Sequence, residues 1–543
     1  MLRRWAPIAV FAGYAWAAQP GPNPLGEGIA LLEKGDAQHS LPLLRRAVEL
    51  DANSAPAHNY LGFALGRTGS VNPAIEEFRK AIRIDPRYAE AFYNLGTALM
   101  IDGQSAAAIQ SLQTAVALRP DFPEALFELG NALAERGEAR DAITAVQKAI
   151  RLRPDMAAAH TTLALLYSGI GDPQDAASEF RRAVALQPNS AEAHNNLGVA
   201  LDQTGDLTGA IEEFRRALAC DSKFVPGFLN LAQAMRDKGD LPAAIENYKK
   251  ALALEPDSGS ARADLGFTLK RSDRLKEALA ELSVAVRLAP DLARAHFYYA
   301  EALTQSGDAA GALVHYERAA RLSPRDAGFR LSYGLALSEK SLPEGTAELQ
   351  EAARLAPNRA DVLTALATAL RKSGETQQAA EVFRKSREAS AAASRRSDAV
   401  LNTNRAIEFL KKGNIDSAID ALRAALAAQP DSPDANHYMG IAQAARQNWA
   451  EANRAFSAAV ESGPRNPDIH FNFGVALEKQ GDWAGAARQF EAVLALSPGH
   501  AQGMCKLADA LGHIGEADRA EKTLRQAREM GPCAIASRPR GDK

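Results

Sequence analysis

The chain is poor in the residues that mark disulfide-rich, metal-binding and nucleic-acid-binding proteins. Three of its 543 residues are cysteines, and no CxxC pair occurs, so the spacing of a structural zinc site is missing. Lysine and arginine (63) nearly balance aspartate and glutamate (66), which gives a formal net charge of −3. Because nucleic acids and acidic membranes attract strongly basic surfaces, we expect neither as a partner.

The known catalytic motifs are also missing. The sequence contains no P-loop, no dinucleotide-binding glycine fingerprint, no GxSxG elbow and no HExxH helix. From residue 21 onward the chain is occupied by repeats, a spacer and a tail, which leaves no room for a catalytic domain. We therefore predict no enzyme activity, no cofactor and no metal site.

The three cysteines allow at most one internal disulfide. We expect Cys220, at the end of a predicted helix, to be a small buried or half-buried side chain. Cys505 and Cys533 lie near the same end of the last two predicted helices. They can form a disulfide if their Cα atoms lie within about 7 Å, so a bridge and two free thiols both remain open.

What the sequence does contain is a period of about 34 residues. Residues 191–224 show one unit, in which Gly205 separates two short apolar-faced segments. Ala210, Phe214 and Ala217 recur at the spacing of one helix face. A single helical hairpin cannot bury both of its apolar faces, whereas stacked neighbours can.

Counting from Ala191 as position 1, the same residue types return in phase along the chain. Position 8 is small, position 15 is usually the turn glycine, and a proline near position 32, such as Pro188, ends the second helix. Position 8 is glycine or alanine in every unit that can be aligned: Gly62, Gly96, Gly130, Ala164, Gly198, Ala232, Gly266, Ala300, Gly334, Gly440 and Gly474.

This pattern resembles the tetratricopeptide repeat, with a bulky residue at 4, Leu at 7, a small residue at 8, Ala at 20, an aromatic at 24, Ala at 27 and Pro at 32. The resemblance covers nearly the whole chain after residue 20. It implies an all-α, right-handed superhelical solenoid of about fifteen tandem helix-turn-helix repeats.

The N-terminal segment, residues 1–19, has the pattern of a secretory signal peptide. Arg3 and Arg4 precede a mostly apolar stretch that ends in Ala15-Trp16-Ala17, a signal-peptidase type of sequence. We therefore expect an exported protein, periplasmic or extracellular, with no membrane span in the mature chain. If the segment is not a signal, the protein is cytoplasmic.

A break in the repeat phase predicts two blocks. The first block, residues 20–393, holds about eleven repeats, and the second, residues 399–534, holds about four. Residues 394–398 are expected to be a spacer or part of a lengthened helix, because the surrounding stretch lacks Gly and Pro. Residues 535–543 are expected to be a disordered tail.

Five histidines share position 4 of their units: His58, His160, His194, His296 and His470. They could form a ladder of metal ligands or fill packing positions. Packed helices lie about 8–10 Å apart, whereas Zn–N bonds are about 2 Å long, so equivalent residues in successive repeats cannot share a metal. We predict a packing role.

The resemblance implies that positions 2, 5, 6, 9, 12 and 13 of the first helices line a concave groove. Position 6 carries a column of asparagines: Asn94, Asn196, Asn230, Asn404 and Asn472. An amide can both donate to and accept from a peptide backbone. The column is similar to the asparagine ladder of O-linked N-acetylglucosamine transferases, so it could hold an extended peptide; the alternative is local packing.

Other groove positions carry aromatic and charged side chains. Tyr93, Phe127 and Phe297 could form pockets for partner side chains. The groove is expected to be acidic towards the N-terminus and more basic in its middle, where Lys270 and Arg271 lie.

The sequence therefore predicts a non-catalytic scaffold that binds extended peptide segments or partner proteins in the groove. The alternative is a structural or assembly scaffold of a cell-envelope machine, such as one for polysaccharide secretion. The sequence leaves the oligomeric state open.

Overall fold

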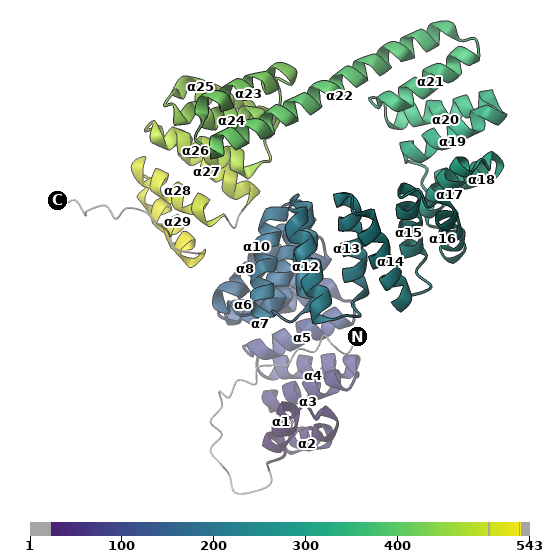
Figure 1. The fold of residues 1–543 in the computed structure, drawn as a ribbon. Helices are drawn as coiled ribbons and strands as arrows, with labels where there is room; N and C mark the ends of the chain where they lie inside the picture. Colours follow the sequence, from purple (N-terminus) through teal and green to yellow (C-terminus); the bar gives the residue numbers. More distant parts are fainter. Residues whose placement is uncertain (1–22, 498–499, 531–532, 534–543) are drawn as a thin grey trace. The chain divides into compact units, whose positions relative to one another are not determined.

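A computed structural model describes residues 23–497, 500–530 and 533, and these residues form 29 helices that pack in consecutive pairs (Figure 1). Within the described ranges every regular element is a helix. The predicted all-α fold of tandem helix pairs is confirmed. The expected signal peptide (1–19) and tail (535–543) lie outside the described residues.

The chain forms two units, Met1–Cys220 and Asp221–Lys543. The helices of the first unit are α1 (Pro24–Glu33), α2 (Ala37–Leu50), α3 (Ala55–Arg67), α4 (Val71–Ile84), α5 (Ala89–Ile101), α6 (Ser105–Leu118), α7 (Pro123–Glu135), α8 (Ala139–Leu152), α9 (Ala157–Gly169), α10 (Pro173–Leu186), α11 (Ala191–Gln203) and α12 (Leu207–Cys220).

The second unit continues the series of helix pairs. Its helices are α13 (Val225–Lys238), α14 (Leu241–Leu254), α15 (Gly259–Arg271), α16 (Leu275–Leu288), α17 (Ala293–Ser306), α18 (Ala309–Leu322), α19 (Ala327–Lys340), α20 (Leu342–Leu355), α21 (Ala360–Lys372), α22 (Thr376–Lys411), α23 (Ile415–Ala428), α24 (Pro433–Ala445), α25 (Trp449–Ser462), α26 (Pro467–Lys479), α27 (Trp483–Leu496), α28 (Ala501–His513) and α29 (Ala517–Met530).

In most repeats a left-handed residue forms the turn between the two helices. Gly205 has φ 85°, in the region that only glycine enters without steric cost. Asp273 (φ 60°) and Gln447 (φ 62°) take the same conformation in two repeats that lack the glycine. These two turns therefore keep the geometry of the glycine turns, whereas α19 and α20 are joined by Ser341 in an extended conformation (φ −142°).

The small residue at position 8 lets the two helices of a repeat approach closely. A Cβ added to Gly198 would lie 2.5 Å from Cε1 of Phe214, the aromatic residue at position 24. Phe214 is 2% exposed, and its neighbours Ala210 and Ala217 are fully buried. The predicted apolar face of the second helix is therefore the core of the helix pair.

Successive repeats join through positions 3, 27 and 28. Ala91, at position 3 of its repeat, packs with Ala81 and Ile82, at positions 27 and 28 of the preceding one. Ala295, Ala285 and Val286 repeat this arrangement later in the chain. Each of these repeats thus buries the apolar face that its neighbour leaves open.

One helix, α22, is 36 residues long and contains the stretch 394–398 that the sequence left as a spacer or part of a helix. Its first part packs with α21 through Ala379 and Val382, and its last part packs with α23 and α24 through Ala406 and Phe409. Between these parts, residues 390–398 are all exposed. The two predicted repeat blocks thus meet in a solvated helical segment, and the domain boundary there stays a prediction.

Charged residues occupy normally apolar positions on either side of this segment. Position 28 is aliphatic or alanine in the other repeats but Arg387 just before the exposed segment and Arg528 in the last repeat. Position 7 is apolar elsewhere but Glu27 in the first repeat and Arg405 just after the segment. Leu401, at the normally buried position 3, is 67% exposed. All five side chains are exposed, and within the residues that the structure describes no further repeat covers them on that side.

The cysteines differ in their surroundings. Cys505 and Cys533 form a disulfide with Cα atoms 5.7 Å apart, which settles the alternative that the spacing left open. Cys220 is exposed, contrary to the expected buried or half-buried side chain, because it lies at the last position of α12. Among the described helices, none combines the length and apolar character needed to cross a membrane.

We expect the exposed segment of α22 to be the first site of tryptic cleavage in the full chain. A solvated stretch of this length is a marginal helix in water, so it opens more often than the packed helices. Limited trypsin treatment with mass spectrometry should place the first cut at Arg395 or Arg396. An Arg395→Gln/Arg396→Gln variant should be cleaved more slowly there, and first cuts within the turns of other repeats would contradict the account.

Candidate functional site

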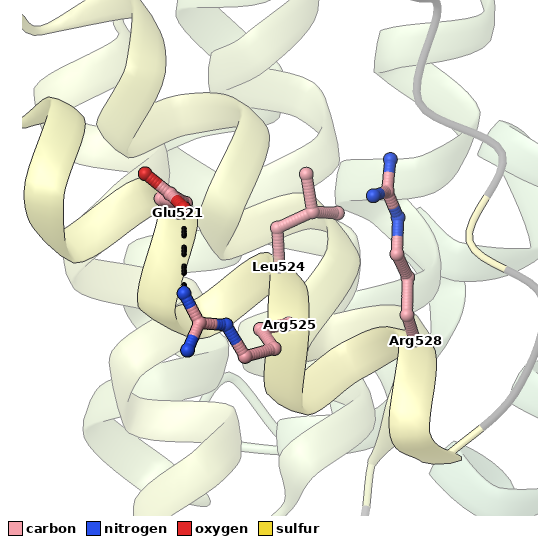
Figure 2. A pocket seen from close by; sticks show the side chains of 4 residues that line it. All are labelled: Glu521, Leu524, Arg525 and Arg528. Carbon is pink, nitrogen blue, oxygen red and sulfur yellow. Dashed lines mark hydrogen bonds and ion pairs between the residues drawn. The ribbon is translucent and has the colours of Figure 1, made fainter.

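Surface hollows give little evidence for a small-molecule site. One hollow of about 320 Å³ lies on α29 and is lined by Glu521, Leu524, Arg525 and Arg528 (Figure 2). These residues belong to a single helix, and Arg525 already donates to Glu521 at 3.3 Å. Ligand sites are normally enclosed by several elements, so this hollow is only a depression in a charged surface.

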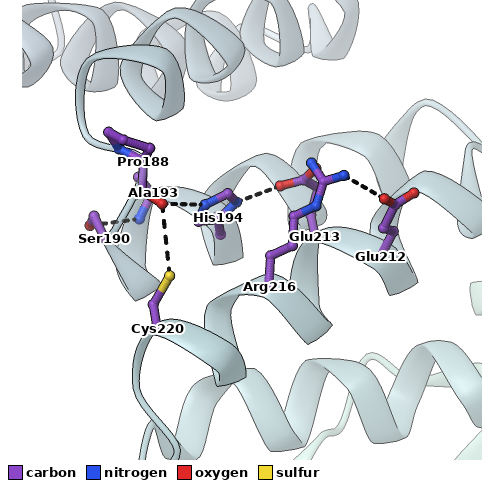
Figure 3. Close-up of polar contacts among 8 residues, drawn as sticks. All are labelled: Pro188, Ser190, Ala193, His194, Glu212, Glu213, Arg216 and Cys220. Carbon is purple, nitrogen blue, oxygen red and sulfur yellow. Dashed lines mark hydrogen bonds and ion pairs between the residues drawn. The ribbon is translucent and has the colours of Figure 1, made fainter.

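The side chain at position 4 connects three parts of the stack, and we call this contact the position-4 clamp. In α11, His194 Nδ1 lies 2.6 Å from Glu213 Oε2 on α12, and Nε2 lies 3.0 Å from the carbonyl oxygen of Pro188 (Figure 3). Pro188 follows the second helix of the preceding repeat, whereas Glu213 belongs to the second helix of the same repeat. The imidazole therefore holds the two repeats together.

The clamp recurs with different side chains. His58 and His160 contact Glu77 and Glu179 at 2.5 and 2.6 Å. Arginine replaces histidine in two repeats, where Arg262 donates to Glu281 and Pro256, and Arg330 donates to Glu348 and Pro324.

These contacts explain the histidines by packing. Both ring nitrogens of His194 are engaged within the clamp, as are those of His160. Among the residues that the structure describes, no three His, Cys, Asp or Glu side chains group as metal ligands.

The charge of the clamp follows from its acceptors. At His160 a carboxylate and a carbonyl oxygen both accept, so the ring donates from both nitrogens when it is protonated. The hydrogen bond to Glu179 raises the pKa of His160 against the opposing effect of burial. This clamp is therefore strongest with a charged imidazole.

One repeat departs from the pattern. His296 Nδ1 lies 2.9 Å from Nδ1 of His315, which occupies the position of the clamp glutamate, and Nε2 contacts the carbonyl oxygen of Pro290. Burial lowers the pKa of both rings. This clamp therefore favours neutral imidazoles, with one ring donating to the other.

The asparagines predicted at position 6 divide into two groups. Asn94 is 3% exposed and donates to Asn59 Oδ1 at 2.9 Å, and Asn472 Nδ2 lies 3.0 Å from His437 Nε2. Both partners occupy position 5 of the preceding repeat, so these amides join neighbouring first helices. Sequence reasoning missed Asn59 and His437, although a polar residue 35 positions upstream was a detectable signal.

The remaining asparagines of the column are more accessible. Asn196 and Asn230 are half-buried, and Asn404 is exposed where α22 leaves its solvated segment. We call the surface formed by positions 2, 5, 6, 9, 12 and 13 of the first helices the inner face. Asn196 and Asn404 remain candidates for contact with a peptide on this face.

The predicted aromatic pockets are largely filled by packing. Tyr93 is buried, with its ring centre 5.0 Å from that of Phe122. Phe297 is half-buried and lies 4.8 Å from Phe329. Phe127 is half-buried on α7. The inner face therefore offers aromatic edges at Phe127 and Phe297, and Tyr93 belongs to the core.

Ion pairs reduce the charge contrast that the sequence predicted. Lys270 Nζ lies 2.6 Å from Glu301 Oε2, whereas Arg271 is exposed. Towards the N-terminus, Glu90 and Glu124 pair with arginines. A formal charge at an inner position therefore does not by itself describe the field that a partner meets.

Sequence reasoning also missed exposed aliphatic side chains at position 9. Leu165 is 56% exposed, Val199 is 37% exposed and Leu335 is 48% exposed. The preceding residue in each repeat, position 8, is small and faces the second helix. A large aliphatic residue at a groove position was the signal that could have identified them.

We expect His315→Glu to convert the neutral clamp into the charged form. The new carboxylate should raise the pKa of His296, which NMR titration of the imidazole measures. In the unchanged chain the pKa values of His296 and His315 are lowered, so folding disfavours their protonation. The stability contributed by this site is therefore lost as pH falls below about 6.5, the ordinary histidine pKa. The variant should instead gain about 1–2 kcal/mol below that pH and lose it as pH rises through the new pKa.

The matched control for this substitution is Glu179→Gln, which should lower the pKa of His160. An unchanged His296 titration in the His315→Glu variant would contradict the proposed charge logic of the clamp.

Comparison with known proteins places these features in a family. Models described as tetratricopeptide repeat match residues 93–157, 161–223, 403–452 and 439–501, residues 200–354 and residues 477–532. A model described as TPR repeat matches residues 67–103. No curated protein matched the chain by sequence.

Solved structures show local similarity to the chain. A crystal structure of MamA is 30% identical and covers 30% of this chain and 94% of MamA, with a TM-score of 0.28. YrrB, described as a TPR protein with an unusual peptide-binding site, is 19% identical and covers 34% of this chain and 95% of YrrB, with a TM-score of 0.31. Yeast Tom70 is 18% identical and covers 67% of this chain and 90% of Tom70, with a TM-score of 0.35.

The helix pairs, their left-handed turns and their small position-8 residues thus coincide with family models that match more than half of the sequence, and the chain belongs to the tetratricopeptide repeat family.

Proposed function

We propose that this chain is a non-catalytic scaffold that binds partner proteins by holding extended segments of them along the inner face. Proteins of the tetratricopeptide repeat family act as interaction scaffolds. The observation that carries the proposal is the exposure of large aliphatic side chains at position 9. The small residue before each of them, at position 8, packs against the second helix of the repeat. Leu165 and Leu335 are 56% and 48% exposed, one in each unit of the chain.

The position-4 clamp supports this role because it fixes each first helix that carries it. In α11, His194 ties the helix to the preceding repeat and to its own second helix. Side chains on the inner face are thus presented from a rigid support, which reduces the entropy lost when a partner binds.

The accessible amides supply contacts that do not depend on the partner's side chains. Asn196 and Asn404 can donate to a backbone carbonyl and accept from a backbone N–H. Asn94 and Tyr93 lie in the core and are removed from the predicted site. Arg271 is exposed and Phe127 is half-buried, so both remain in the predicted site.

We also propose that the protein is exported. The charged start, apolar stretch and Ala15-Trp16-Ala17 sequence support this location. The disulfide between Cys505 and Cys533 supports it as well, because such bonds persist in oxidising compartments.

Photo-cross-linking in the source cell tests the binding surface. Benzoylphenylalanine should replace exposed inner residues, Gln203, Gln233 and Asn404, in separate variants of the full chain. Matched controls carry it at exposed residues of second helices, Arg215 and Val314. We expect adducts with partner polypeptides at the inner positions, at least several-fold more abundant than at the controls. Adducts confined to Arg215 and Val314 would place the working surface on the second helices instead.

A further inference from the structure

We propose that the inner face of α7, α9 and α11 selects extended peptide segments in which aliphatic side chains are flanked by lysine or arginine. This inference rests on the proposed function and specifies the chemistry of the partner at one part of the inner face.

The apolar component is a pair of exposed aliphatic residues at the same repeat position. Leu165 on α9 and Val199 on α11 are 34 residues apart in sequence, and both occupy position 9. They are 56% and 37% exposed, and Ile170 at the end of α9 is 48% exposed. Covering such side chains removes apolar surface from water, which stabilises a complex.

The charged component has a single sign. Lysine and arginine occur at none of the inner positions of α5, α7, α9 and α11, whereas carboxylates occur at Glu90, Glu124, Glu128, Glu135, Glu192 and Asp202. Arg119 and Arg153, which follow second helices, pair with Glu90 and Glu124 at 2.6 and 2.8 Å. Counted together with these two arginines, the six carboxylates leave the formal charge of the surface negative.

The pKa values of two tyrosines, buried Tyr93 and half-buried Tyr60, are raised next to these carboxylates. Burial raises the pKa of Tyr93, and the carboxylates of Glu128 and Glu124 raise it further. Burial also raises the pKa of Tyr60, and Glu90 adds to that effect. The carboxylate contributions at both tyrosines have the direction expected beside a carboxylate-rich surface, and Arg153 opposes the one at Tyr93.

Other parts of the inner face lack this combination. In the second unit, Arg236, Lys270 and Arg294 occupy inner positions together with Asp264 and Glu301. Lys270 pairs with Glu301, and Arg294 pairs with Asp264. Positive and negative groups thus alternate there.

The partner follows by complementarity. An aliphatic pair within a carboxylate-rich surface fits apolar side chains with cationic neighbours, and it disfavours acidic segments because like charges meet. The half-buried amides of Asn131 and Asn196 lie on the same first helices and can bond to the partner's backbone. The surface therefore combines burial, charge and backbone contacts.

Fluorescence anisotropy with synthetic peptides and the full chain tests the proposal. The probe is fluorescein-labelled Gly-Lys-Val-Lys-Lys-Val-Lys-Gly. One comparison peptide has glutamate in place of each lysine, and another has serine in place of each valine. We expect the probe to bind about tenfold more tightly than either comparison peptide, with an affinity that falls as salt rises.

The variants assign the binding to this surface. Leu165→Ser/Val199→Ser should weaken binding of the probe about tenfold, whereas Val314→Ser, a change of an exposed aliphatic residue on a second helix, should leave it unchanged. Circular dichroism should show equal helicity for both variants. Undetectable binding of the probe, equal binding of the glutamate peptide, or no effect of Leu165→Ser/Val199→Ser would each overturn the proposal.

The outcomes also separate this proposal from the proposed function. If the probe fails to bind but benzoylphenylalanine at Gln203 still cross-links a partner, the inner face binds a partner of different chemistry. If cross-links form only at second-helix positions, the proposed function itself is wrong.

Discussion

The position-4 clamp is the polar contact on which stacking depends in the repeats that carry histidine or arginine at that position. In α11 the His194 imidazole joins the carbonyl of Pro188 to the carboxylate of Glu213, which is 8% exposed. Charged hydrogen bonds of this kind contribute about 1.5–3 kcal/mol each, and removing the ring would leave a nearly buried carboxylate without that partner. The clamp recurs along the chain with histidine or arginine. It uses the polar groups between repeats for stacking and leaves the inner face for binding.

The helix pairs were predictable because their signals are local. The turn of one helix pair depends on Gly205, and its packing depends on Gly198 and Phe214. The spacing of these residues along the chain suffices to identify them. The roles of the asparagines were not predictable in this way. Asn94 and Asn404 share position 6, but Asn94 meets Asn59 in the preceding repeat, whereas the continuous α22 carries Asn404 away from such a neighbour.

The charge of the groove and the organisation of the repeats were likewise predictable only in part. The sequence identified acidic and basic groove positions, but it did not show that Lys270 is paired with Glu301, since the two residues lie on different helices. Residues 394–398 were recognised as a break in phase, and the structure forms a helix through them. Arg387 and Arg405 indicated that the repeats on either side of this segment do not stack on each other, and the sequence analysis did not use this signal. A charged residue at a normally buried position indicates that no neighbouring repeat covers it.

A double-mutant cycle on His194 and Glu213 tests the central claim, that the clamp couples neighbouring repeats, most directly. Native-state hydrogen exchange in α10, α11 and α12 would be measured for His194→Ala, Glu213→Ala and both together. The account predicts faster exchange in all three helices for each single variant. The double variant should be no less stable than the less stable of the two single variants, which corresponds to a coupling energy of about 1–3 kcal/mol between the two side chains. Additive effects, or faster exchange confined to the helix that carries the change, would contradict it.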